Sequence, residues 1–136
     1  QPVYRYRYCH PRPDMVLKDK VAGLAGGVQD KTSDTPAAPK NIGAVHSADI
    51  EYAMGTLPTN RVYDWQPEDY TISDIFSNYY VNFVKTGNPN GLGLIEWPTT
   101  NGKAIAPVLQ IDANTFVKED PNMEKRYEIM DQLFWK

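Results

Sequence analysis

The sequence predicts an α/β chain with few strands and two long helices. Three observations lead to this fold class. Residues 2–8, "PVYRYRY", alternate strictly between a tyrosine face and a second face, which is typical of a strand. Residues 67–85 carry apolar side chains at spacings of three and four, which indicates one face of a helix. Residues 107–112, "PVLQID", have the composition of a short strand.

Length and composition point to one globular unit. The chain has 136 residues, a net charge of −3 and no internal repeat or linker, so we treat residues 1–136 as one part of a single domain. It has no Lys/Arg-rich stripe, which argues against a nucleic-acid partner, and no apolar run of membrane-spanning length, which argues against insertion into a membrane. The single cysteine, Cys9, cannot form an internal disulfide. The chain opens on a predicted strand without a methionine or a visible signal peptide, and we therefore expect a fragment or a processed piece.

The first half contains one long irregular stretch before its helices. Residues 11–43 are rich in proline and glycine, and we expect 12–40 to form a long mobile loop with one short helical turn near 16–22. A short helix is predicted over 47–54 and is closed by Gly55.

The long helix over 67–85 has clear boundaries. Pro67 suits the first helical position, and Glu68 and Asp69 suit the positive end of the helix dipole. Gly87 and Pro89 end the helix.

The last third is predicted to contain turns, two strands and a helix. Residues 86–103 are turn-rich, and the segment 115–119 is expected to pair with the strand at 107–112. The final helix should begin near Asp120–Pro121, a cap followed by proline. Its apolar stripe consists of Met123, Tyr127, Met130 and Phe134.

One of the two histidines, His46, lies in the stretch "NIGAVHSADIEYAMG" at 41–55. It could be a catalytic base, a metal ligand or a buried, hydrogen-bonded core residue. A zinc site normally takes three protein ligands, and beyond His46 and Asp49 no third ligand is evident, so we expect no metal. From the residues alone, the base and core interpretations stay open.

Nucleophilic chemistry within the chain is disfavoured. None of its serines stands in a G-x-S-x-G sequence; they are Ser33, Ser47, Ser73 and Ser77. Cys9 and His10 are adjacent, and adjacent residues of a strand point to opposite faces, which argues against a Cys–His dyad.

The order of the segments resembles the C-terminal part of the type B carboxylesterases, the family of para-nitrobenzyl esterases and cholinesterases. After a strand, these proteins carry a loop of the form G-x-x-H-x-x-[DE]-[IL]-x-[FY], and then a helix ending in NF-x-x-TG-x-PN and a Trp-Pro pair. The loop matches Gly43, His46, Asp49, Ile50 and Tyr52. The helix end and the following pair match Asn82, Phe83, Thr86, Gly87, Pro89, Asn90, Trp97 and Pro98.

The resemblance implies a C-terminal fragment of an α/β-hydrolase fold and a serine carboxylesterase that acts on small carboxylic esters without a cofactor. In the family, the histidine matched by His46 is the general base of the catalytic triad, and the acid matched by Asp49 supports the site from behind. The family's nucleophile, oxyanion-hole glycines and triad acid lie upstream, outside this chain. The segment alone is therefore expected to be inactive. The stretch "PKNIG" before His46 contains no aromatic ring, which argues against a choline-type site and favours the broad bacterial esterases.

Two alternatives and the partners follow from the same resemblance. Some relatives, such as the neuroligins, have lost the nucleophile and serve in adhesion, so a non-catalytic binding module is the alternative function. A stand-alone small interaction domain is a third possibility. A lone strand at 2–8 would expose an unpaired edge, so the expected partners are the N-terminal portion of the same enzyme or a second copy of this chain. Family habit allows a periplasmic or secreted location as readily as a cytoplasmic one.

Overall fold

The computed structural model describes residues 1–22, 28–34, 43–103 and 105–134. Its centre is a three-stranded sheet of order β1-β4-β5, in which β1 runs parallel to β4 and β5 runs antiparallel to it. The strands are β1 (Tyr6–Tyr8), β4 (Pro107–Ile111) and β5 (Phe116–Glu119). The predicted strand at 107–112 and its pairing with 115–119 are thus confirmed.

The first strand is shorter than the predicted 2–8. Arg5 still pairs with the sheet, because its carbonyl accepts a hydrogen bond from the Leu109 amide of β4 (2.9 Å). The Val3 carbonyl instead accepts one from the amide of Thr100, which lies outside the strands (2.8 Å). The alternation of the sequence is kept: Tyr4 packs edge to face against Phe83 and Trp97 on the helix side of the sheet.

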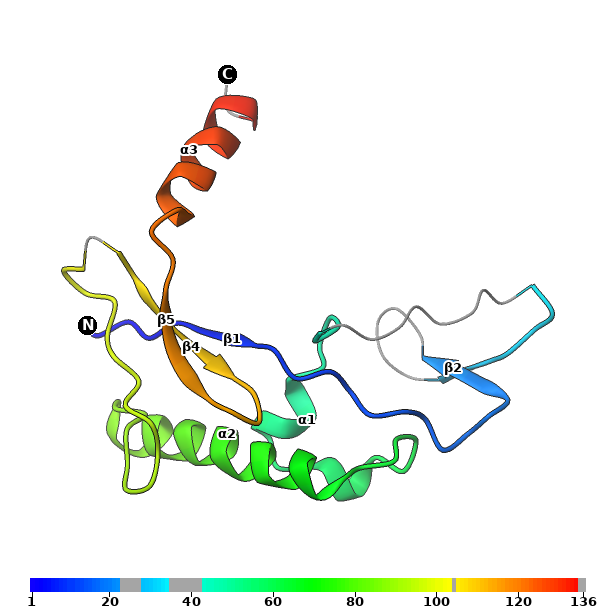
Figure 1. Ribbon diagram of the computed structural model, residues 1–136. Coiled ribbons are helices and arrows are strands. Elements are labelled where there is room, and N and C mark those ends of the chain that lie inside the picture. Colours follow the sequence, from blue (N-terminus) through cyan, green and yellow to red (C-terminus); the bar gives the residue numbers. More distant parts are fainter. Residues whose placement is uncertain (23–27, 35–42, 104, 135–136) are drawn as a thin grey trace.

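The long helix α2 (Pro67–Thr86) lies along one face of the sheet (Figure 1). Its boundaries confirm the prediction from sequence to within one residue. Pro67 occupies the first turn, and the Asp69 carboxylate accepts a hydrogen bond from the Gln66 amide (2.7 Å), satisfying one of the free amides at the helix start. Gly87 ends the helix with φ of 76°, a left-handed conformation that glycine adopts without strain.

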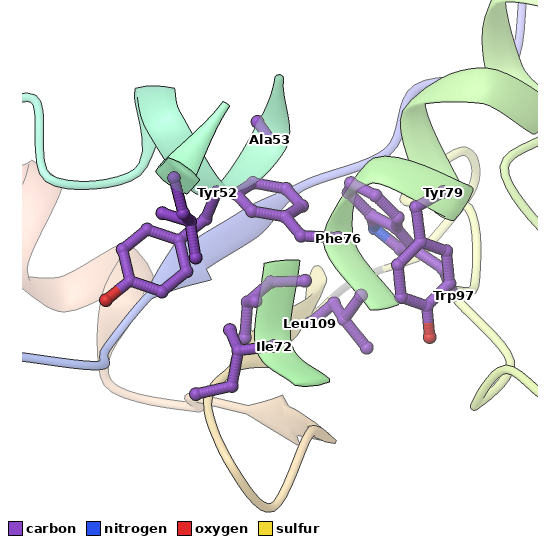
Figure 2. Close-up of a cluster of buried hydrophobic side chains, with 9 residues drawn as sticks. Tyr52, Ala53, Ile72, Phe76, Tyr79, Trp97 and Leu109 are labelled. Carbon is purple, nitrogen blue, oxygen red and sulfur yellow. The ribbon is translucent and has the colours of Figure 1, made fainter. Parts of the chain in front are cut away.

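The core lies between α2, β4 and the segment that carries α1, and it is largely aromatic (Figure 2). Tyr79 packs edge to face on Trp97 with ring centroids 5.4 Å apart, and Phe76 does the same on Tyr6 at 5.1 Å. Such pairs add to the stabilisation that burial of their area provides. The buried members of this core are Tyr52, Ala53, Leu57, Ile72, Phe76, Tyr79, Trp97, Leu109 and Ile111.

The segment 12–40 departs from its prediction. Instead of a helical turn near 16–22, the structure has an antiparallel hairpin of β2 (Lys20–Ala22) and β3 (Val28–Asp30). Lys20 lies opposite Asp30 and forms an ion pair with it, a pairing across ten residues that local periodicity could not reveal. The hairpin stands away from the sheet in Figure 1. Residues 23–27 and 35–40 of this segment lie outside the described residues, and the expected mobility of the loop stays a prediction.

The remaining helices differ from prediction at their starts. α1 (Ile50–Ala53) is shorter than the predicted 47–54, because residues 46–49 form a turn. A 3-10 turn, η1 (Leu57–Thr59), follows it. α3 (Met123–Phe134) begins after Pro121 rather than with it, and none of its described residues is buried. α3 projects away from the sheet in Figure 1.

Candidate active site

His46 lies in the turn that leads into α1, and its side chain is exposed. Within the described ranges, no hydrogen bond involves its imidazole ring. The interpretation of His46 as a buried core histidine is therefore wrong. The next residue, Ser47, has φ of 61°, a left-handed conformation that L residues rarely adopt. The backbone direction immediately after His46 is thus set by an unusual conformation.

Asp49 lies behind this turn and binds the sheet. Its carboxylate accepts a hydrogen bond from the Tyr6 hydroxyl (2.9 Å), which connects α1 with β1. Burial, the Tyr80 hydroxyl and the Asp49 carboxylate together raise the pKa of Tyr6, so its phenol remains a donor at neutral pH. No hydrogen bond or ion pair between Asp49 and the ring of His46 is found among the described residues. Asp49 thus holds the backbone of the turn in place.

Arg12 is a second anchor of the turn, and its role was not predicted from the sequence. Its guanidinium donates to the Ser47 carbonyl (3.1 Å) and forms an ion pair with Glu51 of α1. It also lies over the ring of Tyr63, 5.0 Å from the centroid. No local signal identifies Arg12, because its partners lie 35 to 51 residues further along the chain.

A buried polar cluster lies below α1, around Asp69. Its carboxylate accepts the Tyr52 hydroxyl hydrogen bond (2.5 Å) and lies 3.0 Å from Nε2 of His10. The other ring nitrogen of His10 lies 3.2 Å from the Asp112 carboxylate. Burial, followed by the hydrogen bond to Asp69, raises the pKa of Tyr52. The cluster fixes the position of Tyr52, and therefore of α1, against the start of α2.

Part of this cluster could have been found from the sequence. His10 follows β1 and Asp112 follows β4, and these strands run parallel. The carboxyl ends of parallel neighbours lie at the same edge of a sheet, which places the two side chains together. From local sequence alone, Asp112 is the last residue of the predicted strand 107–112, and Asp69 is an acid that suits the helix dipole.

The described residues provide no partner for His46 within the chain. Ser73 is buried and donates to the Tyr52 carbonyl (2.9 Å), and Ser77 donates to the Asp74 carbonyl (3.3 Å). Cys9 has its sulfur 3.3 Å from the Gln110 side-chain oxygen, and burial raises the pKa of its thiol, which disfavours the reactive thiolate.

No group of three or more potential His, Cys, Asp or Glu metal ligands occurs in the described ranges. No described helix combines the length and apolarity needed to cross a membrane.

Taken together, the turn offers an exposed imidazole on a backbone that is bound at several points. Tyr6 holds Asp49, Arg12 holds Ser47, and the Asp69 cluster holds Tyr52. An exposed imidazole can accept or donate a proton near neutral pH. The chemistry that this arrangement offers is therefore proton transfer to a group presented from outside the described residues.

Comparison with solved structures identifies the fold. A thermophilic PNB esterase aligns over 94% of this chain with a TM-score of 0.63 and 21% identity, and another PNB esterase over 94% with a TM-score of 0.60 and 20% identity. These alignments cover 22% and 21% of the solved chains. The two proteins are esterases of the α/β-hydrolase fold, which confirms the predicted fold class, and the present chain corresponds to a part of that fold.

Sequence relatives point the same way. Human (Homo sapiens) bile salt-activated lipase is 41% identical over 58 residues, which are 43% of this chain and 8% of the lipase. Carboxylesterase 4A of Bos taurus is 29% identical over 135 residues, which are 99% of this chain and 19% of that protein. The chain thus spans less than a fifth of the length of these curated relatives. The carboxylesterase family model matches residues 1–135, and the chain therefore belongs to the carboxylesterase family.

Proposed function

We propose that the chain supplies the triad histidine, His46, to a serine hydrolase of carboxylic esters. The observation that carries the proposal is the arrangement of the turn. An exposed imidazole stands at the histidine position of the family's loop sequence, and the backbone around it is held by Asp49 and Arg12. A general base must reach the proton of the nucleophile's hydroxyl from a fixed position, and this arrangement suits that requirement. Asp49 supports the turn and is not the triad acid.

In the proposed reaction, His46 takes the proton from a serine hydroxyl as its oxygen attacks the ester carbonyl. The resulting imidazolium gives that proton to the leaving alkoxide when the carbon–oxygen bond of the ester breaks. His46 then takes a proton from water, whose oxygen attacks the acyl-serine, and it returns the proton to the serine on release of the acid. The chain's own residues are required to hold the imidazole and move this proton.

The nucleophile and the triad acid would come from outside residues 1–136. The chain's serines lack the G-x-S-x-G sequence, and the described Ser73 and Ser77 bind backbone carbonyls. We therefore expect the isolated chain to be inactive toward esters. A carboxylesterase that contains this chain should lose activity when His46 is replaced.

The test compares p-nitrophenyl acetate hydrolysis by the isolated chain and by the full gene product that contains it. His46→Ala should lower kcat of the full enzyme by about 10⁴-fold or more, whereas Val45→Ala, at an exposed neighbour in the same turn, should leave it nearly unchanged. Burst kinetics from the isolated chain that depend on His46 would refute the expected inactivity. Full activity of His46→Ala would refute the proposed base. A gene product without a G-x-S-x-G serine would favour the non-catalytic binding module.

The surface beside β1 is the proposed contact with the rest of such an enzyme. β1 pairs with β4 on one side, and none of the described residues pairs with its other edge. Beside the strand lies an apolar groove of about 370 Å³, lined by Pro2, Val3, Tyr4, Tyr6, Tyr79, Tyr80, Phe83, Pro89 and Trp97. Parallel sheets are normally covered on both faces, so an edge strand next to an apolar groove favours a further strand and its covering segment as the occupant.

This contact is tested by sedimentation of the isolated chain over a range of concentrations. Without its proposed partner, the chain should associate with itself, and Phe83→Asp should weaken that association. Val81→Asp is the matched control, because Val81 is similarly exposed but lies outside the lining of the groove. A chain that stays monomeric at every concentration, with a well-dispersed NMR spectrum, would count against the contact.

A further inference from the structure

We propose that Arg12 is a positioning residue for His46, which acts by holding the left-handed backbone of Ser47. The inference rests on the proposed role of His46 as the general base. Arg12 lies outside the loop sequence that contains the histidine. It acts through the carbonyl of Ser47 rather than through the imidazole of His46.

The backbone of Ser47 needs such a holding contact. Its φ of 61° brings Cβ close to the following carbonyl, and a serine leaves this region readily when nothing keeps it there. Ser47 is the residue directly after His46, so a change of its φ would redirect the chain between the histidine and α1. The position of the imidazole therefore depends on what binds Ser47.

Arg12 provides the contact from a nearly buried position. One terminal nitrogen of its guanidinium donates to the Ser47 carbonyl (3.1 Å) and also binds Glu51, while the other lies 3.3 Å from the Tyr63 hydroxyl. The Arg12 side chain is only 11% exposed and that of Glu51 19%. At such a site a charged hydrogen bond is screened little by solvent.

The guanidinium is itself fixed by its surroundings. The Asp14 carbonyl accepts the Asp64 amide hydrogen bond (2.9 Å), which keeps the segment after Arg12 beside the segment that carries Tyr63. Glu51 also accepts a hydrogen bond from the Asn60 side chain (2.6 Å). Arg12 thus connects the Ser47 carbonyl with Glu51 and Tyr63, which are themselves held in place. A lysine could pair with Glu51, but it lacks the planar fork that reaches the carbonyl and the tyrosine together.

The first arm of the test needs no catalysis. In the 136-residue chain carrying Phe83→Asp, which should weaken self-association, the amide–Hα coupling and the Cα and Cβ chemical shifts of Ser47 report its φ. They should indicate a positive φ when Arg12 is present and shift toward ordinary negative φ in Arg12→Met and Arg12→Lys. Amide exchange at 46–49 should accelerate at least tenfold in Arg12→Met. Unchanged shifts and exchange in that variant would overturn the proposal.

Ser47→Gly distinguishes positioning from simple stabilisation. Glycine adopts positive φ without a steric penalty, so Ser47→Gly should restore part of the lost geometry in the Arg12→Met background. In the full enzyme, Arg12→Met should lower kcat by about a hundredfold with little change in KM, and the double variant should recover at least tenfold of that loss. A drop in stability and kcat that Ser47→Gly does not rescue would show a structural role only.

The two proposals fail in different ways. If His46→Ala retains full esterase activity, the proposed function is wrong, and the NMR arm still decides whether Arg12 holds Ser47. If His46→Ala is inactive while Arg12→Met keeps both the Ser47 shifts and full kcat, the proposed function stands and the positioning role of Arg12 is wrong.

Discussion

Replacing Asp69 should cause a large loss of stability, because one buried carboxylate contacts three polar groups. The side chain of Asp69 is 2% exposed. Its oxygens accept from the Tyr52 hydroxyl (2.5 Å) and the Gln66 amide (2.7 Å) and lie 3.0 Å from Nε2 of His10. Asp69→Ala removes all three contacts and leaves His10 buried between one remaining carboxylate, that of Asp112, and a void.

The magnitude follows from these contacts. A hydrogen bond to a charged group contributes about 1.5–3 kcal/mol, but the three contacts of Asp69 share one carboxylate and do not add independently. Breaking a buried charged cluster by removing one member costs about 3–5 kcal/mol, and we expect a decrease of that size in the free energy of unfolding. The free energy of unfolding of Asp69→Asn should lie between those of the wild type and Asp69→Ala, since the asparagine amide keeps one acceptor oxygen.

Urea denaturation followed by tryptophan fluorescence measures this change. Asp74→Ala is the matched control: Asp74 is exposed on the same helix, so the variant shares the gain in helix propensity without the buried contacts. The difference in free energy of unfolding between the two alanine variants gives the contribution of the buried contacts of Asp69. A loss below about 1 kcal/mol for Asp69→Ala, or one equal to that of Asp74→Ala, would refute the reasoning.

Two further predictions concern the core and a turn. Burial raises the pKa of Tyr52 and Tyr79, so the folded state favours the neutral phenols. This stabilisation is complete below a pH of about 10 and is lost above it, by at most about 1.4 kcal/mol per pH unit for each tyrosine. Urea denaturation between pH 9 and 11 measures how the free energy of unfolding falls with pH. Tyr79→Phe should make this fall less steep, because it removes the contribution of one tyrosine. A free energy of unfolding that does not change over this pH range contradicts the prediction. Gly91→Ala should cost about 1 kcal/mol, because its Cβ would lie 2.5 Å from the Asn82 amide nitrogen. Thermal unfolding measures this loss, with Gly43→Ala as the control because a Cβ there meets nothing within 4 Å. Equal unfolding midpoints for the two variants would contradict the prediction.

The sequence predicted best what neighbouring residues determine. α2 was predicted almost to its boundaries, because its apolar period, its first-turn proline and acids, and its terminal glycine all lie within about twenty residues. The hairpin of β2 and β3 was missed, since Lys20 and Asp30 attract each other only once the chain has turned back. α3 begins at Met123, two residues after the predicted start at Pro121, because residues 121–122 form a turn before the helix.

The same distinction applies to the candidate site: some of its residues can be identified from local sequence, and others depend on partners far away in the chain. His46 and Asp49 were identified from a short loop sequence, and the exposure of His46 then excluded the core interpretation that the residues alone had left open. Arg12 and its ion pair with Glu51, 39 residues away, depend on how β1 continues past the sheet, which no local pattern records. His10 and Asp112 could have been paired only by first recognising two parallel strands.

The position of the histidine turn is coupled to the edge of the sheet through Tyr6. Its ring lines the apolar groove beside β1, and its hydroxyl holds Asp49 behind His46. Tyr80 lines the same groove and donates its hydroxyl to that of Tyr6 (3.3 Å). A segment seated in the groove would therefore pack against the two tyrosines that hold the turn. If the rest of an esterase docks there, as we propose, assembly would fix the backbone behind His46 by the same contact that brings a nucleophile within its reach.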